Sequence, residues 1–120
     1  MITLMKRSDL GVIPYRNTFD LQNSLSNKTI EYLAGGVALT TGLDGKVRQL
    51  IRDNDCGYLY SDQSSSAYRN LLLEILADRQ TLERRKKAAR TLYQERFRAE
   101  SVYGDFRDYL FEVAAAHRRV

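Results

Sequence analysis

A polar loop that leads into a short helix carries the residues best suited to bind a ligand. The stretch 24–36 reads SLSNKTIEYLAGG, and either Ser26 or Asn27 can cap the helix, because a short side-chain oxygen accepts a hydrogen bond from the amides of the first turn. Lys28 and Glu31 lie near this helix start. Free amides beside a lysine favour an anion, although most capped helices bind nothing. The stretch predicts either an anion site or an ordinary capped helix.

The neighbouring apolar residues must position this helix. Ile30, Leu33 and Ala34 recur at three-and-four spacing and are expected to face a core. Gly35 and Gly36 are expected to supply the positive φ that ends a helix. A strand-like apolar run follows at once.

Other kinds of site have little support in this sequence. Cys56 and His117 are the single cysteine and the single histidine, which excludes an internal disulfide and a zinc site of the usual kind. His117 lies near the end of the chain, so no nucleophilic triad is expected. A lone cysteine agrees with a reducing compartment.

The composition is that of an ordinary globular domain, with 43% hydrophobic and 28% charged residues. No run approaches the roughly 20 apolar residues that cross a bilayer. The N-terminus has no apolar stretch after a basic region, as a signal peptide would. We therefore expect a cytoplasmic protein, with peripheral contact at the inner membrane face as an option.

The net charge of +4 is concentrated in one segment. Between Arg79 and Arg98 only Glu83 and Glu95 oppose eight basic residues, Arg79, Arg84, Arg85, Lys86, Lys87, Arg90, Arg96 and Arg98. A solvated helix face is the favoured interpretation, and contact with an anionic membrane surface is the alternative. No nucleic acid is expected as a partner, because aromatic residues do not alternate with the basic ones as in single-strand binders.

The order of elements predicts an α/β fold. Strands are expected at 9–15, 37–41 and 57–60, irregular loops at 16–23 and 61–66, and helices at 27–34, 44–53, 67–77, 81–95 and 99–116. The last helix places Val102, Phe106, Tyr109, Leu110 and Val113 on one face. Alternating strands and helices give parallel strands joined by right-handed crossovers. About three parallel strands with flanking helices and a helical C-terminal end amount to half of a Rossmann-like domain.

These segments together resemble the C-terminal part of a GT-B glycosyltransferase, of the group 1 (family 4) type that builds bacterial surface polysaccharides. The resemblance covers nearly the whole chain, so 1–120 is interpreted as one partial nucleotide-sugar donor domain. It rests on DLGVIPY, NDCGYLY, ERFRAESVY and the central stretch, where the family commonly has Leu-Pro-Asn-Lys and then Glu-Tyr-x-Ala-x-Gly. The matching residues are Leu25, Asn27, Lys28, Glu31, Tyr32, Ala34 and Gly36, and Ser26 stands where proline is common.

The resemblance implies transfer of a sugar from a nucleotide-diphosphate sugar to an acceptor hydroxyl, with retention and with no cofactor or metal. Glu31 matches the second of the family's two glutamates and is expected to hold the ribose hydroxyls. Asn23 occupies the place of the first, without its charge. The loop 24–28 is expected to lie by the diphosphate. The implied donor-binding set is Tyr15, Arg16, Asn23, Ser24, Leu25, Ser26, Asn27, Lys28 and Glu31; the catalytic residues are unknown.

By this resemblance the chain begins at the fourth strand of the donor domain. It would therefore keep one wall of the donor crevice, and the isolated chain is expected to be inactive. A truncated gene product, an excised piece and a remnant all fit. The alternative function is a non-enzymatic interaction module. In that case the strand Asp9–Pro14, as an exposed sheet edge, would pair with a second copy or with the missing half-domain.

Overall fold

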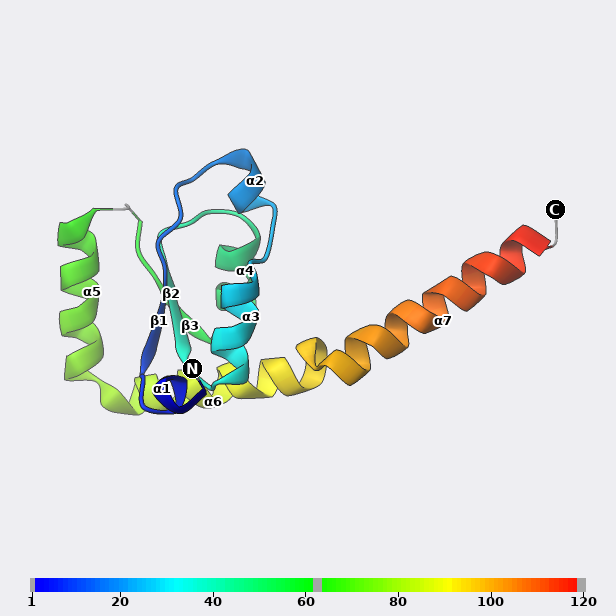
Figure 1. Ribbon diagram of the computed structural model, residues 1–120. Coiled ribbons are helices and arrows are strands. Elements are labelled where there is room, and N and C mark those ends of the chain that lie inside the picture. Colours follow the sequence, from blue (N-terminus) through cyan, green and yellow to red (C-terminus); the bar gives the residue numbers. More distant parts are fainter. Residues whose placement is uncertain (1, 62–63, 119–120) are drawn as a thin grey trace.

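A parallel three-stranded sheet forms the centre of the protein. The computed structural model describes residues 2–61 and 64–118. The strands are β1 (Leu10–Ile13), β2 (Ala38–Thr41) and β3 (Gly57–Leu59), in the order β1-β2-β3. Ile13 aligns with Thr41, and Thr41 aligns with Leu59, so the carboxyl ends of the three strands meet at one edge (Figure 1). The predicted α/β class with about three parallel strands is confirmed.

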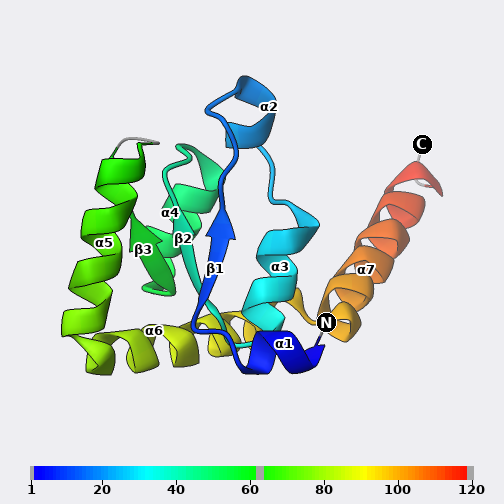
Figure 2. The ribbon, with the colours of Figure 1, turned by 60° about the vertical axis from the view of Figure 1, so that its left-hand side comes forward.

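Helices cover both faces of the sheet and one of its ends. They are α1 (Ile2–Lys6), α2 (Phe19–Gln22), α3 (Asn27–Ala34), α4 (Lys46–Asn54), α5 (Ser65–Ala77), α6 (Arg79–Leu92) and α7 (Ala99–Arg118), with a π-helical segment, η1 (Tyr93–Phe97), between the last two. Figure 1 shows α3 and α4 on one side of the sheet and α5 on the other, and Figure 2 shows α6 running below the amino ends of the strands.

The middle strand separates two apolar cores. Leu39 packs into the larger core with residues of α3, α4 and α6, and Leu33 and Val47 are fully buried there. Ala38, one residue earlier, belongs to the second core with Leu71 of α5. Alternate residues of a strand point to opposite faces, and all four residues of β2 are buried. The uninterrupted apolar run is therefore explained by helices on both faces.

Most predicted elements are confirmed, with several corrections of detail. Gly36 has the positive φ of 67°, but Gly35 is helical with a φ of −78°. The predicted loop 16–23 contains the single-turn helix α2, and the predicted helix 81–95 begins at Arg79 and changes to π geometry at Tyr93. The predicted loop 61–66 includes two residues, 62 and 63, that lie outside the described part of the chain.

Basic side chains of the helix α6 bind it to the sheet. Lys86 Nζ lies 2.9 Å from Asp9 Oδ1, just before β1. Arg85 Nη1 donates to the carbonyl of Gly57 at 2.9 Å, and its guanidinium stacks 4.3 Å from the ring centre of Tyr58. Arg85 and Lys86 are half-buried, so the expectation of a purely solvated basic face is corrected for these two residues.

The helix α7 leaves the body of the protein. The molecule measures 60 × 31 × 25 Å, and its radius of gyration is 17.0 Å, whereas about 14 Å is typical for a compact domain of this length. Figure 1 shows the cause, because α7 extends away from the sheet as an isolated arm. The five apolar residues predicted to share one face of this helix are all exposed. None of the described helices is long and apolar enough to cross a membrane.

Candidate functional site

The predicted binding residues begin where β1 and β2 end. The Thr41 hydroxyl donates to the Ile13 carbonyl at 2.9 Å and accepts from the Leu43 amide at 3.0 Å. This buried threonine holds the ends of two strands together and fixes where their loops start. Tyr15 and Arg16 follow β1 directly.

The two loops that leave this edge are joined by an asparagine that the sequence interpretation missed. Asn17 Oδ1 accepts from the Asp44 amide at 2.7 Å, and its Nδ2 donates to the Gly42 carbonyl at 3.3 Å. Gly45 allows the close approach of the same loops, because a Cβ there would overlap the carbonyl of Gln22. An asparagine shortly after a strand was the available sequence signal, but nothing local indicated its distant partners.

The start of α3 is built as the sequence predicted. Ser26 is the N-cap, and its Oγ accepts from the Thr29 amide at 3.2 Å. The same oxygen lies 2.9 Å from the Thr29 hydroxyl. Thr29 is fully buried, so the cap is anchored in the core and the helix N-terminus is held rigidly. The hydroxyl of Ser26 is thus occupied by the helix itself.

Lys28 and Glu31 are both exposed and line the same cavity. They are separated by three residues on α3, which places them on the same side of a helix. The cavity has a volume of about 310 Å³ and lies between α1 and α3, next to β1. Its remaining walls are Leu4, Met5, Ser8, Leu10, Tyr32 and Val37.

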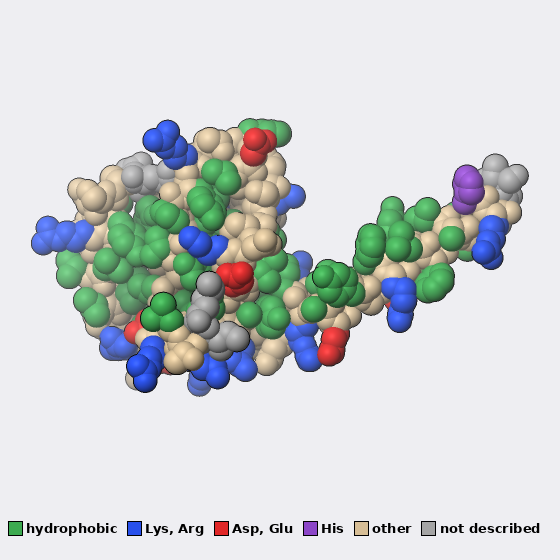
Figure 3. All heavy atoms as spheres, viewed as in Figure 1, with side chains coloured by type: hydrophobic (Ala, Val, Ile, Leu, Met, Phe, Trp, Pro, Cys, Tyr) green, Lys and Arg blue, Asp and Glu red, His purple; other side chains and the backbone are tan. Residues whose placement is uncertain are grey.

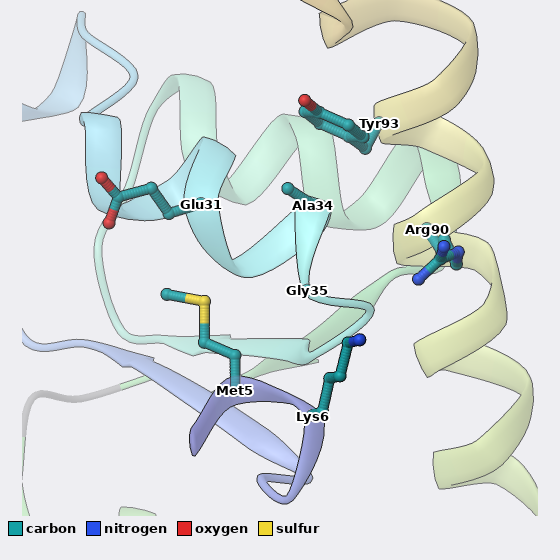
Figure 4. A pocket seen from close by; sticks show the side chains of 7 residues that line it. All are labelled: Met5, Lys6, Glu31, Ala34, Gly35, Arg90 and Tyr93. Atoms are coloured by element: carbon teal, nitrogen blue, oxygen red, sulfur yellow. The ribbon is translucent and has the colours of Figure 1, made fainter. Parts of the chain in front are cut away.

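Glu31 also borders a second cavity, of about 440 Å³, between α1, α3 and α6 (Figure 4). Its other lining residues are Met5, Lys6, Ala34, Gly35, Arg90 and Tyr93. In Figure 4 the carboxylate of Glu31 points away from Lys6 and Arg90. The two cavities form a groove along α3, and its opposite wall is α1. The sequence interpretation did not include α1 in the site.

The remaining predicted residues are dispersed around this groove and the strand edge. Tyr15 and Leu25 are half-buried and pack against the larger core. Asn23 donates from Nδ2 to the carbonyl of Phe19 at 2.8 Å, which completes α2. Arg16, Ser24 and Asn27 are exposed. The structure therefore brings Lys28 and Glu31 into one cavity, while Tyr15, Leu25 and Ser26 have packing or capping contacts.

The chemistry available in the groove is binding by one carboxylate and nearby cations. Within residues 2–61 and 64–118, no three His, Cys, Asp or Glu side chains are grouped as metal ligands. Cys56 is buried, and desolvation raises the pKa of its thiol to about 11, which keeps it protonated at neutral pH.

Comparisons with protein-family models, curated proteins and solved structures found no match for this chain.

Proposed function

We propose that this chain supplies one wall of a nucleotide-sugar site in a glycosyltransferase of the GT-B type. The proposal rests on the resemblance of the stretch 24–36 to group 1 transferases. The observation that supports it most directly is that Lys28 and Glu31 line a single cavity. This cavity reaches Leu10, the first residue of β1, and Val37, which precedes β2, so it lies toward the amino ends of the strands and not at the carboxyl ends where α/β ligands usually bind.

Each residue has a chemical role in this proposal. The Glu31 carboxylate accepts hydrogen bonds from both hydroxyls of a ribose diol, since its two oxygens have several acceptor positions. The Lys28 ammonium and the amides of the loop 24–28 lie toward the diphosphate, because a helix N-terminus and a lysine both favour negative charge. Tyr32 and Leu10 supply apolar walls of the same cavity.

A donor site that has only one of its two halves binds a sugar nucleotide weakly and does not enclose the bond that reacts. We expect the chain alone to bind UDP- or GDP-sugars with a millimolar Kd, corresponding to about −4 kcal/mol, and to transfer no sugar. Titration of the ¹⁵N-labelled protein with UDP-glucose and GDP-mannose measures both the Kd and the residues that respond. Sugar transfer by the isolated chain would refute the one-wall proposal.

The ribose role of Glu31 has its own test. We expect Glu31→Gln to abolish the shifts that UDP causes near α3, and 2′-deoxy-UDP to bind the unmodified chain no better than the variant binds UDP. Glu100→Gln is the matched control, because Glu100 is an exposed glutamate on the projecting helix α7. Equal affinity of UDP for the Glu31 variant and the control would remove Glu31 from the site.

A second candidate function is an interaction module that pairs through β1. In the described sheet β1 has a neighbour on one side only, and its residues Leu10 and Val12 are half-buried. An edge strand of this kind can accept the strand of a second copy or of a missing half-domain. We expect Val12→Lys to abolish such pairing, because lysine on an edge strand opposes it. A variant that associates as strongly as the original chain would exclude this edge as the contact.

A further inference from the structure

The cavity between α1, α3 and α6 has apolar walls and a positively charged rim. Its volume is about 440 Å³, which is within the range of roughly 300–1,000 Å³ that small-molecule sites occupy. Met5, Ala34 and Tyr93 are half-buried in its walls. Lys6 and Arg90 also line it, but they are exposed. The cavity therefore offers apolar contacts inside and positive charge at its mouth.

The two cations at the rim have no acidic partner within residues 2–61 and 64–118. In contrast, Lys86 of the same helix α6 is paired with Asp9. Glu31 lines the cavity as well, but in Figure 4 its carboxylate points away from Lys6 and Arg90. Two positive charges are therefore left to attract an anion.

The surface around the cavity is basic. Figure 3 shows Lys and Arg side chains gathered along the lower edge of the body, where α1 and α6 lie in Figure 1. Asp9 and Asp55 each face two basic side chains of α6, which leaves this surface with an excess of positive charge. Such a surface raises the local concentration of negatively charged ligands.

The wall that Tyr93 supplies is also the place where the helix geometry changes. The helix α6 ends at Leu92, and π-helical geometry begins at Tyr93. A π-helical turn is rare and is frequently found at functional sites. Because it begins at a residue that lines the cavity, the backbone gives a second indication of a ligand that is independent of the charges.

We propose that this cavity binds an anion that carries an apolar body, of the class of the alkyl phosphates. The apolar body packs against Met5, Ala34 and Tyr93. The phosphate lies at the rim, where the Lys6 ammonium and the Arg90 guanidinium donate hydrogen bonds to its oxygens. Two cations match the charge of a phosphate monoester, which is about −1.5 to −2 at neutral pH.

This site can be tested separately from the nucleotide-sugar site and from pairing through β1. Met5 and Glu31 border both cavities, but the cations differ, because Lys28 lines the first cavity and Lys6 and Arg90 line the second. A half-domain would continue the sheet from β1. None of the described residues of β1 lines this cavity, so pairing at that edge does not by itself fill it.

Titration of the ¹⁵N-labelled whole chain with hexyl phosphate, inorganic phosphate and hexanol tests the proposal. Burial of about two methylene groups corresponds to about a tenfold gain in affinity. We therefore expect hexyl phosphate to bind at least about tenfold more tightly than either of the other two compounds, and to shift the amide signals of Gly35 and Tyr93. No binding, or equal binding of hexyl phosphate and inorganic phosphate, would overturn the proposal, because the apolar walls would then have no role.

Two variants separate the contribution of the charges from that of the cavity. The double variant Lys6→Gln/Arg90→Gln should raise the Kd of hexyl phosphate at least about fivefold, since it removes two exposed ion pairs. Its matched control is Lys87→Gln/Arg96→Gln, which removes the same charge from exposed residues that do not line the cavity and should change the Kd by less than about twofold. Equal effects of the two double variants would overturn the proposal.

The second variant, Ala34→Leu, keeps every charge and fills the cavity. It should raise the Kd of hexyl phosphate at least about tenfold and leave the weak binding of inorganic phosphate unchanged. Circular dichroism reports whether the variant is folded, and if it is not, the two double variants still decide. A folded Ala34→Leu chain that binds hexyl phosphate as tightly as the original chain would place the ligand outside the cavity.

Vesicles of phosphatidylcholine and phosphatidic acid distinguish the source of the anion. Cosedimentation that Ala34→Leu weakens would assign the site to a phospholipid. A chain that binds hexyl phosphate but does not cosediment would assign it to a soluble alkyl phosphate. Cosedimentation of a chain that does not bind hexyl phosphate would reduce the contact to surface charge and overturn the proposal.

Discussion

The substitution Gly11→Ala should reverse the sign of its effect when one neighbouring ring is removed. Gly11 lies in β1, and a Cβ at this position would lie 2.5 Å from both Cγ and Cδ2 of Tyr32. Its φ is not in the left-handed region. The glycine is therefore required by the tyrosine ring above it and not by the backbone. This ring joins α3, which carries Lys28 and Glu31, to the outer strand of the sheet.

The magnitude follows from two opposing effects. Forcing a methyl group into a packed contact costs about 1–3 kcal/mol. Alanine in place of glycine restricts the unfolded chain and returns about 0.4–1 kcal/mol. We expect Gly11→Ala to lower the free energy of unfolding by about 1–2 kcal/mol. In a Tyr32→Ala background the steric cost is gone, and Gly11→Ala should raise this free energy by about 0.5 kcal/mol.

Urea unfolding followed by circular dichroism measures all four proteins of this double-mutant cycle. The coupling between Gly11 and Tyr32 should be about 1.5–2.5 kcal/mol, within the range for side chains in contact. Gly104→Ala in α7 is the control, because a Cβ there meets nothing within 4 Å and should only improve helix stability by about 0.5–1 kcal/mol. If Gly11→Ala is equally destabilising with and without the tyrosine ring, the contact is not the reason for the glycine.

Two further predictions concern titration and reactivity. The hydrogen bond and charge of Lys86 hold the pKa of Asp9 below its usual value of 3.8, so this carboxylate stabilises the fold above about pH 4, and the contribution is lost as the pH falls through the lowered pKa. Since the Asp9 side chain is 44% exposed, Asp9→Asn should lower the free energy of unfolding by less than about 1 kcal/mol at pH 7. The urea midpoints of the variant and the original chain should converge toward pH 2. A difference that stays constant with pH would contradict the ion pair. Cys56 is buried and its thiol has a raised pKa of about 11, so it should not react with Ellman's reagent at pH 8 until urea unfolds the chain. Rapid and complete labelling of the folded protein would show instead that the thiol is accessible.

Local sequence patterns were sufficient for the elements but not for the site. The helix 27–34 and a cap at Ser26 or Asn27 were predictable because capping and helical periodicity involve residues within four positions of each other, and the structure selects Ser26. The cavity around Glu31 was not predictable in the same way. One of its walls comes from α1, more than twenty residues earlier, so Met5 and Glu31 line the same cavity only in the folded chain.

The basic run shows the same division. The sequence showed eight cations between Arg79 and Arg98 and few acids near them, from which a solvated face was the reasonable prediction. The acid that pairs with Lys86 is Asp9, 77 residues away in the chain, and the carbonyl that Arg85 reaches belongs to Gly57. Two of the eight cations, Arg85 and Lys86, therefore hold α6 against the sheet.

Sequence alone thus determined the α/β order and the parallel strands, because these depend on periodicity and caps within a few residues. The stretch 24–36 stays a prediction of where a ligand binds. Tertiary structure decided which side chains meet there. It placed Lys28 and Glu31 in one groove with α1, assigned Ser26 and Leu25 to capping and packing, and left the apolar face of α7 in solvent. Amphipathic periodicity indicates that a helix face needs a partner, but the partner is set by contacts between distant segments or between chains.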